Sequence, residues 1–541
     1  MKSEEFTPWP KNLEDKYMSA GVWQGVTIGE LLDRTAAKYP AKEALINGPT
    51  RLTYSQWSQA VNRIALGLLE LGLKKGDKVI LQLPNIPEFI YVFFALTKIG
   101  VVPVNALIQH RNREIGHLLN ITEAPAIVIP AEYRGFNFLK MIEELRPTSK
   151  NLKHIIVAGD DAPSRTVSLK ELMNTPREDK YPRDYLNKFK PGANDVAYLA
   201  LSGGTTGYPK AIPRTHNDFI SLNNAHIRLC KVNADSAFLV TLPVAHNIGL
   251  AFVIQSVIAG GKLVLLTGTK TEDILKLIQD EKISVTVLVP TLISDIVKFP
   301  DLDKYNLNSL SVVESGGAEA NIAMIRTLSS KMKGRVLNVF GMSEGVIFMP
   351  RVSDSMEVAS ETIGRPCCPE DEIKILDEGG KEVPPGIEGE LTVRGPHCFR
   401  GYFKDPEENR KSFNNEGFFH TGDLAVRRPD GNYKLVGRKK DMIIRGGENI
   451  SASEVEELLR SYEKVQDVAV VGMPDARLGE KVCAFVIPKA GGKVSLDELT
   501  AFLKTKNIAI FKFPEKVELV GQFPLTSVGK VDKKKLKEIL K

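Results

Sequence analysis

A glycine-rich run directly after a predicted strand constrains this 541-residue chain more than any other feature. Residues 195–200 are mostly apolar and predict a short buried strand, and residues 202–207 contain three glycines, one serine and two threonines. Glycine lets backbone N–H groups approach a ligand closely, and hydroxyls near a cation such as Lys210 form a nest for phosphate oxygens. Tyr208 and Pro209 separate the last glycine from Lys210, which is not the spacing of a Walker A loop. The run therefore predicts a phosphate loop of another kind, with a flexible surface loop as the alternative.

Helical and strand patterns alternate along the chain on both sides of this loop. Residues 54–71 carry apolar side chains at the spacing of an amphipathic helix, and residues 78–83 predict a buried strand. Such alternation is typical of parallel, doubly wound sheets, so we expect an α/β fold. Residues 1–25, which contain Pro8 and Pro10, predict an irregular arm. The other expected elements are helices at 28–39, 87–99, 217–229 and 272–280 and strands at 43–46, 101–104, 262–266 and 284–289, and the segments 292–297, 310–314, 321–330 and 336–340 continue the pattern.

The alternation of helical and strand patterns ends near residue 370. From there to residue 437, strand-like runs and turn signals predict a small β-rich subdomain. We expect residues 1–437 to form a large N-terminal body and residues 438–541 to form a small mobile α+β C-terminal domain. The charged segment 437–441 is the expected hinge between them. The elements expected in the C-terminal domain are helices at 454–459 and 495–504 and strands at 465–471 and 481–488.

Charge, hydropathy and cysteine usage exclude several classes of function. The net charge of +6, from 72 basic and 66 acidic residues, comes without a long basic stripe, so we expect no nucleic-acid partner. The longest apolar run covers residues 89–96, which is too short to span a bilayer, and the N-terminus has no apolar signal segment. Five cysteines without metal or disulfide spacing indicate free thiols in a reducing compartment. We therefore expect a cytoplasmic protein with no membrane partner.

Further motifs follow the glycine-rich loop in a fixed order. They are Ser315-Gly316-Gly317-Ala318, Asn338-Val339-Phe340-Gly341-Met342-Ser343-Glu344, Gly401-Tyr402-Phe403, Thr421-Gly422-Asp423, Gly437-Arg438-Lys439-Lys440-Asp441, Arg445-Gly446-Gly447-Glu448-Asn449-Ile450 and Pro524-Leu525-Thr526-Ser527-Val528-Gly529-Lys530. Loop and motifs together resemble the adenylate-forming superfamily of acyl-CoA synthetases, peptide-synthetase adenylation domains and luciferases. The resemblance covers nearly the whole chain and implies an AMP-forming acid ligase that uses ATP and Mg²⁺.

The resemblance also implies a role for each motif. A carboxylate would attack the α-phosphate of ATP and release pyrophosphate, so the site must position and neutralise charge. Lys530 would bridge the carboxylate and the α-phosphate, and Glu344 would bind Mg²⁺, which prefers oxygen ligands. Asp423 would accept both ribose hydroxyls. The structural alternatives are a surface lysine, a glutamate at a helix start and an ordinary turn aspartate. The other implied nucleotide-binding residues are Ser202, Gly203, Gly204, Thr205, Thr206, Gly207, Lys210, Gly317, Ala318, Val339, Phe340, Gly341, Met342, Ser343, Leu435, Arg438 and Lys440.

The segment Leu242-Pro243-Val244-Ala245-His246-Asn247 bears on the acid substrate. It resembles the His-Asn pair of aryl acid–AMP ligases, which activate 2,3-dihydroxybenzoate or salicylate for siderophore biosynthesis. In those enzymes the asparagine hydrogen-bonds the ring hydroxyl beside the carboxylate. Phe252 stands where that subfamily has a small serine or cysteine, and an unmet hydroxyl costs about 1–3 kcal/mol. We therefore expect salicylate, benzoate or an alicyclic acid, held by His246, Asn247, Phe252, Gly316 and Val346.

The thiol acceptor and the class of function leave alternatives open. The aryl acid resemblance implies transfer to the phosphopantetheine of an aryl or acyl carrier protein, whereas Asn449 is more typical of CoA ligases. The resemblance further implies that the C-terminal domain rotates between the two half-reactions. A nucleotide-binding protein without catalysis would have lost Lys530, Glu344 or Asp423, and all three are present.

Overall fold

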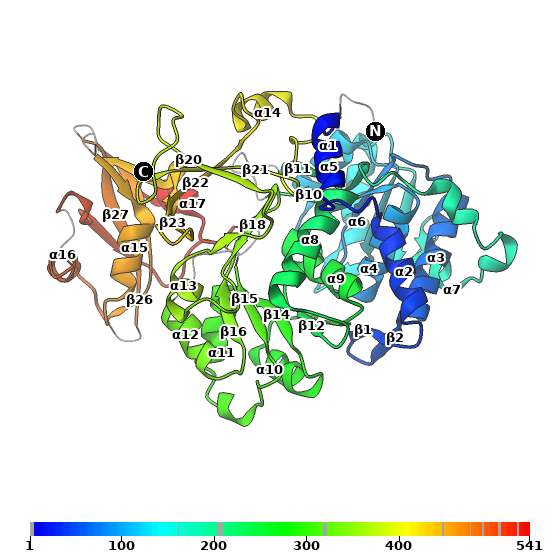
Figure 1. The fold of residues 1–541 in the computed structure, drawn as a ribbon, viewed down its shortest axis with the longest axis horizontal. Helices are drawn as coiled ribbons and strands as arrows, with labels where there is room; N and C mark the ends of the chain where they lie inside the picture. Colours follow the sequence, from blue (N-terminus) through cyan, green and yellow to red (C-terminus); the bar gives the residue numbers. More distant parts are fainter. Residues whose placement is uncertain are drawn as a thin grey trace. The chain divides into compact units, whose positions relative to one another are not determined.

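The computed structural model divides into two compact units, a larger and a smaller one (Figure 1). The larger unit comprises Met1–Glu372 and Arg394–Gly417, and the smaller comprises Ile373–Val393 and Phe418–Lys541. The structure describes residues 5–160, 162–202, 209–316, 322–445, 448–475, 478–489, 492–506, 510–526 and 530–540.

The larger unit is built on two seven-stranded sheets whose strand order is far from sequence order. In the first, all neighbours are parallel except β1 and β2. In the second, only β10 and β11 are antiparallel. The first sheet is β16 (Arg335–Asn338), β15 (Val312–Ser315), β14 (Val285–Leu288), β12 (Ala237–Val240), β13 (Lys262–Leu265), β1 (Glu43–Asn47) and β2 (Thr50–Thr53). The second is β11 (Ala211–Thr215), β10 (Val196–Leu201), β4 (Val102–Asn105), β3 (Lys78–Leu81), β5 (Ala126–Pro130), β8 (His154–Ala158) and β9 (Val167–Ser168).

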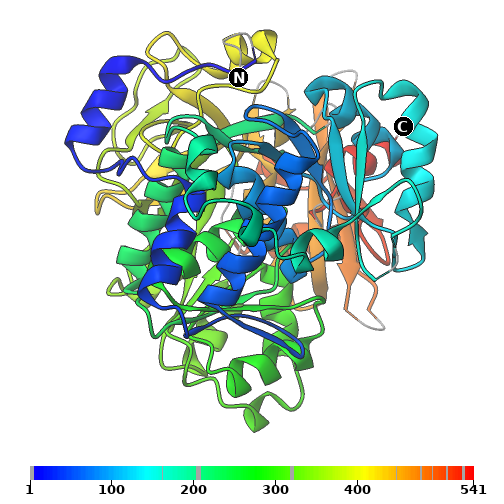
Figure 2. The same cartoon turned by 90° about the vertical axis from the view of Figure 1, so that its right-hand side faces the viewer.

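Helices cover both faces of these sheets, which explains why their strands are continuously apolar. The apolar side chains of α10, α11 and α12 pack on one face of the first sheet, and those of α5 and α6 pack on the second. Helices α3, α4, α8 and α9 contact the other faces, and Figure 2 shows the blue helices between the green and cyan strands. The doubly wound α/β prediction is confirmed. The helices of this unit are α1 (Lys11–Ser19), α2 (Ile28–Lys38), α3 (Tyr54–Glu70), α4 (Pro87–Lys98), α5 (Asn112–Thr122), α6 (Phe138–Leu145), α7 (Leu169–Asn174), α8 (His216–Cys230), α9 (Asn247–Ala259), α10 (Thr271–Asp280), α11 (Pro290–Val297), α12 (Ile322–Ser330), α13 (Met356–Glu361) and α14 (Pro406–Ser412).

Three short strands complete the larger unit near the predicted site. β17 (Phe340–Met342) and β18 (Gly345–Met349) form an antiparallel hairpin, and β19 (Arg365–Pro366) pairs with β18. The larger unit also contains a two-stranded antiparallel ribbon of β6 (Glu132–Tyr133) and β7 (Phe136–Asn137).

The prediction of an irregular arm for residues 1–25 is wrong, because α1 forms within it. This helix has no side-chain cap and only one buried residue, Tyr17, so it carries little amphipathic pattern. Trp9, Tyr17 and Trp23 form an aromatic cluster with ring centroids 4.9–5.8 Å apart. Tertiary packing of these rings therefore stabilises a helix that the local sequence does not predict.

The smaller unit contains two sheets. The four-stranded sheet is β20 (Glu372–Leu376), β21 (Glu388–Arg394), β22 (Phe419–Arg427) and β23 (Tyr433–Arg438), which confirms the predicted β-rich segment. The second sheet is β25 (Glu448–Ser451), β24 (Met442–Arg445), β27 (Gly479–Pro488) and β26 (Val465–Asp475), with β28 (Lys516–Leu519) beside β27. Its helices are α15 (Ala452–Arg460), α16 (Leu496–Lys504) and α17 (Lys533–Ile539). The division of the chain groups both sheets together, and a hinge at residues 437–441 stays a prediction.

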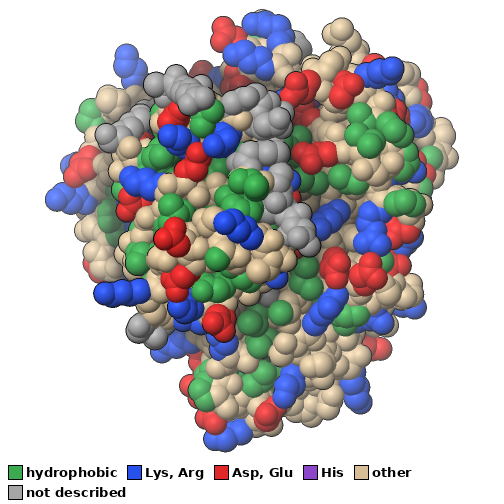
Figure 3. Space-filling model, turned by 90° about the vertical axis from the view of Figure 1, so that its left-hand side faces the viewer, with side chains coloured by type: hydrophobic (Ala, Val, Ile, Leu, Met, Phe, Trp, Pro, Cys, Tyr) green, Lys and Arg blue, Asp and Glu red, His purple; other side chains and the backbone are tan. Residues whose placement is uncertain are grey.

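Surface charge and thiols agree with the composition. Lysine and arginine side chains are interspersed with aspartate and glutamate on the face drawn in Figure 3. All five cysteines are buried and free. Within the described ranges, no helix is both long enough and apolar enough to cross a membrane.

Acid is expected to destabilise the larger unit through His216, the first residue of α8. Its side chain is fully buried, Nδ1 accepts the Ile28 N–H at 3.1 Å, and burial lowers the pKa of the ring to about 3. The pKa of a histidine in an unfolded chain is near 6.5. As the pH falls below this value, the unfolded chain binds a proton at this residue and the folded chain does not, so acid favours unfolding. We expect this residue to remove about 2 kcal/mol of stability between pH 7.5 and pH 5.

Urea unfolding of the wild type and of His216→Asn at both pH values measures this contribution. Asparagine keeps a hydrogen-bond acceptor but does not titrate, so the variant should lose less stability on acidification. An equal loss in both proteins would contradict the assignment.

Candidate active site

Glu344 lies in the turn between β17 and β18, and an aromatic residue holds its carboxylate. Tyr402 Oη donates a hydrogen bond to Glu344 Oε1 at 3.0 Å, and the Phe399 N–H donates to the Glu344 carbonyl oxygen at 2.6 Å. Burial and the neighbouring carboxylate raise the pKa of Tyr402, so its phenol remains a donor. The Gly401-Tyr402-Phe403 motif thus positions the predicted metal ligand.

The backbone that follows Glu344 is strained. Gly345 has φ +114°, and a Cβ there would lie 1.9 Å from the His397 carbonyl oxygen, so only glycine fits. Val346, a β-branched residue, has φ +55° and is fully buried. Such conformations for β-branched residues are uncommon and are found at functional sites. The predicted metal ligand and the predicted substrate residue Val346 therefore share one strained turn.

Substitution of Gly345 by alanine is expected to cost about 3 kcal/mol of folding free energy, from backbone strain and overpacking against His397. Urea denaturation measures the change. Gly72→Ala is the matched control, because Gly72 has φ +83° and a Cβ there would meet nothing within 4 Å, so its cost should be about 1 kcal/mol. Equal costs at the two positions would contradict the steric argument.

Lys210 and Ser202 close the two ends of the glycine-rich loop. The Ser202 N–H donates to the Lys210 carbonyl oxygen at 3.0 Å, and the Lys210 N–H donates to Ser202 Oγ at 3.3 Å. The Lys210 ammonium lies 2.5 Å from the Glu408 carboxylate and 4.8 Å from the centre of the Tyr402 ring. Lys210 and Glu344 therefore both contact Tyr402. The predicted loop residues Gly203, Gly204, Thr205, Thr206 and Gly207 lie outside the described residues.

The predicted acid-binding residues gather around the start of α9. Tyr198 Oη donates to Asn247 Oδ1 at 2.5 Å, which leaves the amide nitrogen of Asn247 facing the Ser343 carbonyl oxygen at 3.4 Å. Arg214, fully buried, donates to the same carbonyl at 2.8 Å. His246 is the N-cap of α9, and its Nδ1 accepts the Ile248 N–H at 3.4 Å. Asn247 and the nucleotide-side residue Ser343 are thus joined directly.

Gly316, which directly follows β15, lies near the start of α9. A Cβ at Gly316 would lie 3.1 Å from the Val339 carbonyl oxygen and 3.7 Å from Ile248 Cδ1. The Val339 N–H donates to the Ser315 carbonyl oxygen at 2.7 Å. The structure therefore brings Gly316 and Val339 next to the residue that follows Asn247. Gly317 and Ala318 lie outside the described residues.

The remaining residues predicted in the larger unit have structural contacts of their own. Phe340, Gly341 and Met342 form β17, where the Phe340 ring packs on Phe348 with centroids 6.0 Å apart. Phe252 is 1% exposed and packs edge-on against Phe238 of β12. Five positions along a helix is about 140° of rotation, so Phe252 leaves α9 in a different direction from Asn247. Its place in the acid pocket stays a prediction.

The smaller unit holds the other predicted nucleotide residues. Asp423 on β22 is 4% exposed, pairs with Arg438 in the sheet, and its Oδ1 lies 2.7 Å from Arg438 Nε. The Asp423 N–H donates to Thr421 Oγ1 at 3.0 Å. Leu435 lies opposite Ala425 in the same pair of strands. The side chains of Lys440 and Asn449 lie outside the described part of the chain.

Two hydrogen bonds join Lys530 to Thr526. The Thr526 N–H donates to the Lys530 carbonyl oxygen at 2.7 Å, and the Lys530 N–H donates to Thr526 Oγ1 at 3.2 Å. The neighbouring residues Leu525 and Val531 form a β-bridge. The Lys530 side chain is exposed.

Four residues of the site are not among the sequence predictions: Tyr198, Arg214, Tyr402 and Glu408. Tyr402 stands in the Gly401-Tyr402-Phe403 motif, but the sequence indicates no role for its hydroxyl. Glu408 lies 198 positions from Lys210, and no local pattern indicates such a pairing. Tyr198 and Arg214 are on the paired strands β10 and β11, where a tyrosine and an arginine in apolar runs are the one available signal.

Comparisons with known proteins agree with this geometry. Residues 32–403 match the AMP-binding enzyme family and residues 454–530 match the AMP-binding enzyme C-terminal domain. The chain belongs to this family of AMP-binding enzymes and is an AMP-forming ligase. Members of the family use ATP with Mg²⁺.

The particular relatives extend over the whole chain. The 2,3-dihydroxybenzoate-AMP ligase of Bacillus subtilis is 39% identical over 537 residues, which are 99% of this chain and 97% of that protein. The salicylyl-CoA synthase / salicylate adenylyltransferase of a Streptomyces species is 35% identical, over 100% of this chain and 98% of its own length. The apo structure of Mycobacterium smegmatis MbtA superposes with a TM-score of 0.76 at 35% identity, over 99% of this chain and 100% of that one.

Proposed function

We propose that the protein activates an aryl carboxylic acid with ATP, releases pyrophosphate, and transfers the aryl group from the adenylate to a phosphopantetheine thiol. The observation that carries this proposal is Asn247, which is held by Tyr198, faces the Ser343 carbonyl oxygen and precedes Ile248, the residue next to Gly316. An amide in that position can hydrogen-bond a ring hydroxyl next to the substrate carboxylate. The activities named for the two relatives, on 2,3-dihydroxybenzoate and salicylate, support an aryl acid.

The donors of the larger unit fit ATP with Mg²⁺. Glu344 offers carboxylate oxygens, the ligands that Mg²⁺ prefers, and Tyr402 orients them. Lys210 offers an ammonium to the β- and γ-phosphates once it exchanges Glu408 for phosphate oxygens. Glu344 would hold Mg²⁺, which would supply positive charge to neutralise the phosphates, and the Lys210 ammonium would position the phosphates and oppose their negative charge.

We propose that the predicted residues of the smaller unit act on the same nucleotide. The Asp423 carboxylate would accept the two ribose hydroxyls, and Arg438, already paired with it, would restrain its orientation. Lys530 would neutralise the substrate carboxylate and the α-phosphate as the new P–O bond forms and the bond to pyrophosphate breaks. Leu435 and Lys440 would complete the nucleotide contacts. Residues 437–441 would act as the hinge between the two half-reactions.

The proposed substrate is salicylate or benzoate rather than a catechol acid. Phe252 supplies apolar volume and no hydrogen bond, so a pocket that includes it leaves a second ring hydroxyl without a partner. His246 caps α9 and fixes the start of the helix that carries Asn247. An alicyclic acid of similar size satisfies the same argument.

ATP–pyrophosphate exchange with benzoate, salicylate, 2,3-dihydroxybenzoate and cyclohexanecarboxylate tests the substrate. We expect exchange with salicylate or benzoate to exceed exchange with the catechol by about tenfold in kcat/KM, the equivalent of one unmet hydroxyl. Octanoate and phenylalanine are the controls for acids outside the class. A clear preference for 2,3-dihydroxybenzoate would overturn the Phe252 argument, and a preference for octanoate or phenylalanine would overturn the aryl acid proposal.

The acceptor proposed first is the phosphopantetheine of an aryl carrier protein, and CoA is the second candidate. The activity named for the Streptomyces relative includes CoA, and Asn449 of this chain favours the same acceptor. Thioester formation from purified aryl-AMP, with CoA in one reaction and a phosphopantetheinylated aryl carrier protein in the other, separates the two. A kcat/KM for CoA above that for the carrier protein would reverse the order.

A further inference from the structure

Two clusters of histidine, cysteine and carboxylate side chains are buried in the larger unit, apart from the groups described above. One consists of His226, Cys230 and Glu314, and the other of Cys368, Asp371 and His397. In each cluster the ligand atoms lie within 4.8 Å of one another. The two clusters differ in whether these atoms have partners.

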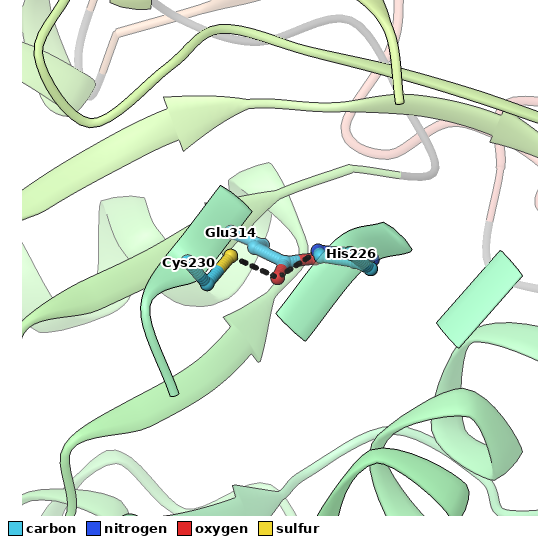
Figure 4. A group of neighbouring side chains, drawn as sticks. All are labelled: His226, Cys230 and Glu314. Carbon is cyan, nitrogen blue, oxygen red and sulfur yellow. Dashed lines mark hydrogen bonds and ion pairs between the residues drawn. The ribbon is translucent and has the colours of Figure 1, made fainter. Parts of the chain in front are cut away.

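In the first cluster, the polar side-chain atoms have hydrogen-bond partners within the protein. His226 Nε2 lies 2.7 Å from Glu314 Oε1, and Cys230 Sγ lies 4.0 Å from the same oxygen (Figure 4). His226 Nδ1 lies 3.3 Å from Gln255 Nε2. Both ring nitrogens of the histidine are therefore used by protein groups. This cluster is a closed hydrogen-bond network and needs no ion.

The second cluster is assembled by two turns. The Asp371 N–H donates to the Cys368 carbonyl oxygen at 3.2 Å, which places the two side chains three residues apart on one turn. His397 comes from the loop that follows Arg394, where the Cys398 N–H donates to the Gly395 carbonyl oxygen at 3.1 Å. A Cβ at Gly395 would lie 2.4 Å from Asp371 Oδ1, so the glycine lets this backbone approach the carboxylate.

In the second cluster the Asp371 carboxylate and the His397 ring make no hydrogen bond to any other described residue. Asp371 and His397 have fully buried side chains, and His397 Nδ1 lies 3.4 Å from Asp371 Oδ2. Among the described residues, neither carboxylate oxygen and neither ring nitrogen makes a hydrogen bond. Cys368 is 3% exposed, and its Sγ donates to Glu370 Oε2 at 2.9 Å. Buried carboxylates and imidazoles are almost always hydrogen-bonded or bound to a metal, so four such atoms together call for a ligand.

We propose that Cys368 Sγ, Asp371 Oδ and a ring nitrogen of His397 bind one Zn²⁺ ion. Thiolate, carboxylate and imidazole are the ligand types that Zn²⁺ takes, whereas Mg²⁺ prefers oxygen alone. Binding removes the proton from the Cys368 thiol, which Glu370 can accept and pass to solvent. The dipositive ion with one thiolate and one carboxylate is neutral overall, and this suits a buried site.

A metal ion at this position would join two segments that carry the candidate active site. The Cys368–Asp371 turn follows β19, which pairs with β18 of the Glu344 hairpin. The His397 loop continues to Phe399 and Tyr402, which hold the main chain and carboxylate of Glu344. The zinc ion therefore stabilises the segment that positions Glu344. It takes no part in the adenylation reaction itself.

Metal binding by the untagged full-length protein tests the proposal. After removal of metals with a chelator, we expect one Zn²⁺ or Co²⁺ per chain, and a thiolate-to-cobalt charge-transfer band with Co²⁺. Excess Mg²⁺ should leave that band unchanged, since Mg²⁺ does not take sulfur. We expect Cys368→Ser and His397→Gln to weaken binding at least about tenfold.

Two matched variants keep the test specific. Cys483→Ser removes another buried free thiol, and His226→Gln alters the first cluster, so both should retain the ion and the charge-transfer band. Loss of binding in His226→Gln with retention in His397→Gln would overturn the proposal in favour of the first cluster. A metal-free protein that takes up neither Zn²⁺ nor Co²⁺ would also overturn it.

X-ray absorption of the zinc-loaded wild type supplies a measurement that needs no variant. We expect one sulfur at about 2.3 Å together with nitrogen and oxygen ligands. A shell of nitrogen and oxygen without sulfur would overturn the assignment of Cys368.

Discussion

Lys530→Ala is expected to lower the rate of aryl-adenylate formation by about 1,000-fold or more, while thioester formation from supplied aryl-AMP stays within about threefold of the wild type. The lysine side chain is exposed and the Thr526 hydrogen bonds involve only the Lys530 main chain, so alanine removes the ammonium without disturbing a core. An ammonium is needed only where charge develops between the carboxylate and the α-phosphate. The second half-reaction begins from a formed adenylate and does not need it.

The two rates are measured separately, by pyrophosphate release in the first half-reaction and by thioester formation from synthetic aryl-AMP in the second. Lys534→Ala is the matched control, because it removes an exposed lysine from α17 near the end of the same unit. Its two rates should both match those of the wild type. If the rates of both half-reactions fell equally in Lys530→Ala, Lys530 would have a structural role instead of the proposed one.

Glu344→Gln is expected to reduce adenylate formation by about 100- to 1,000-fold and to raise the Mg²⁺ concentration needed for half-maximal rate. The amide keeps the volume of the side chain and can still accept a hydrogen bond from Tyr402, so the fold should be retained. What the variant loses is the negative charge that binds the metal. Initial rates over a range of Mg²⁺ concentrations give both quantities.

Two control variants distinguish the effect of the Glu344 charge from the effect of its orientation. Tyr402→Phe removes the hydrogen bond that orients Glu344 and should lower the rate less, by about tenfold, with little change in the Mg²⁺ requirement. Glu361→Gln alters a carboxylate paired with Arg326 and should change neither quantity. An unchanged Mg²⁺ requirement in Glu344→Gln would contradict its assignment as the metal ligand.

Most of the fold could be predicted from periodicity, and the exceptions have identifiable causes. Helices such as α3 and strands such as β3 follow their apolar patterns within about two residues, because burial on one or both faces sets the pattern. Helix α1 depends on aromatic packing that its own sequence does not encode. Helix α9 is apolar on all sides, since it is buried between elements, and therefore shows no helical stripe.

The candidate site could be predicted where a motif is contiguous and not where partners are distant. Glu344, Asp423 and Lys530 each stand in a recognisable local motif. The contact of Lys210 with Glu408 and that of Tyr198 with Asn247 join separate elements, and only the fold brings them together. The cluster of Cys368, Asp371 and His397 likewise comes from two turns whose spacing in the sequence has no metal-binding pattern.

Adenylation of an aryl acid is tested most directly by a single-turnover reaction of the full-length protein with ATP, Mg²⁺ and salicylate, with no thiol acceptor present. The products are separated by liquid chromatography and identified by mass spectrometry. We expect salicyl-AMP and pyrophosphate in equal amounts, up to one of each per chain. Formation of ADP and phosphate, or of no nucleotide product with any aryl acid of the panel, would contradict it.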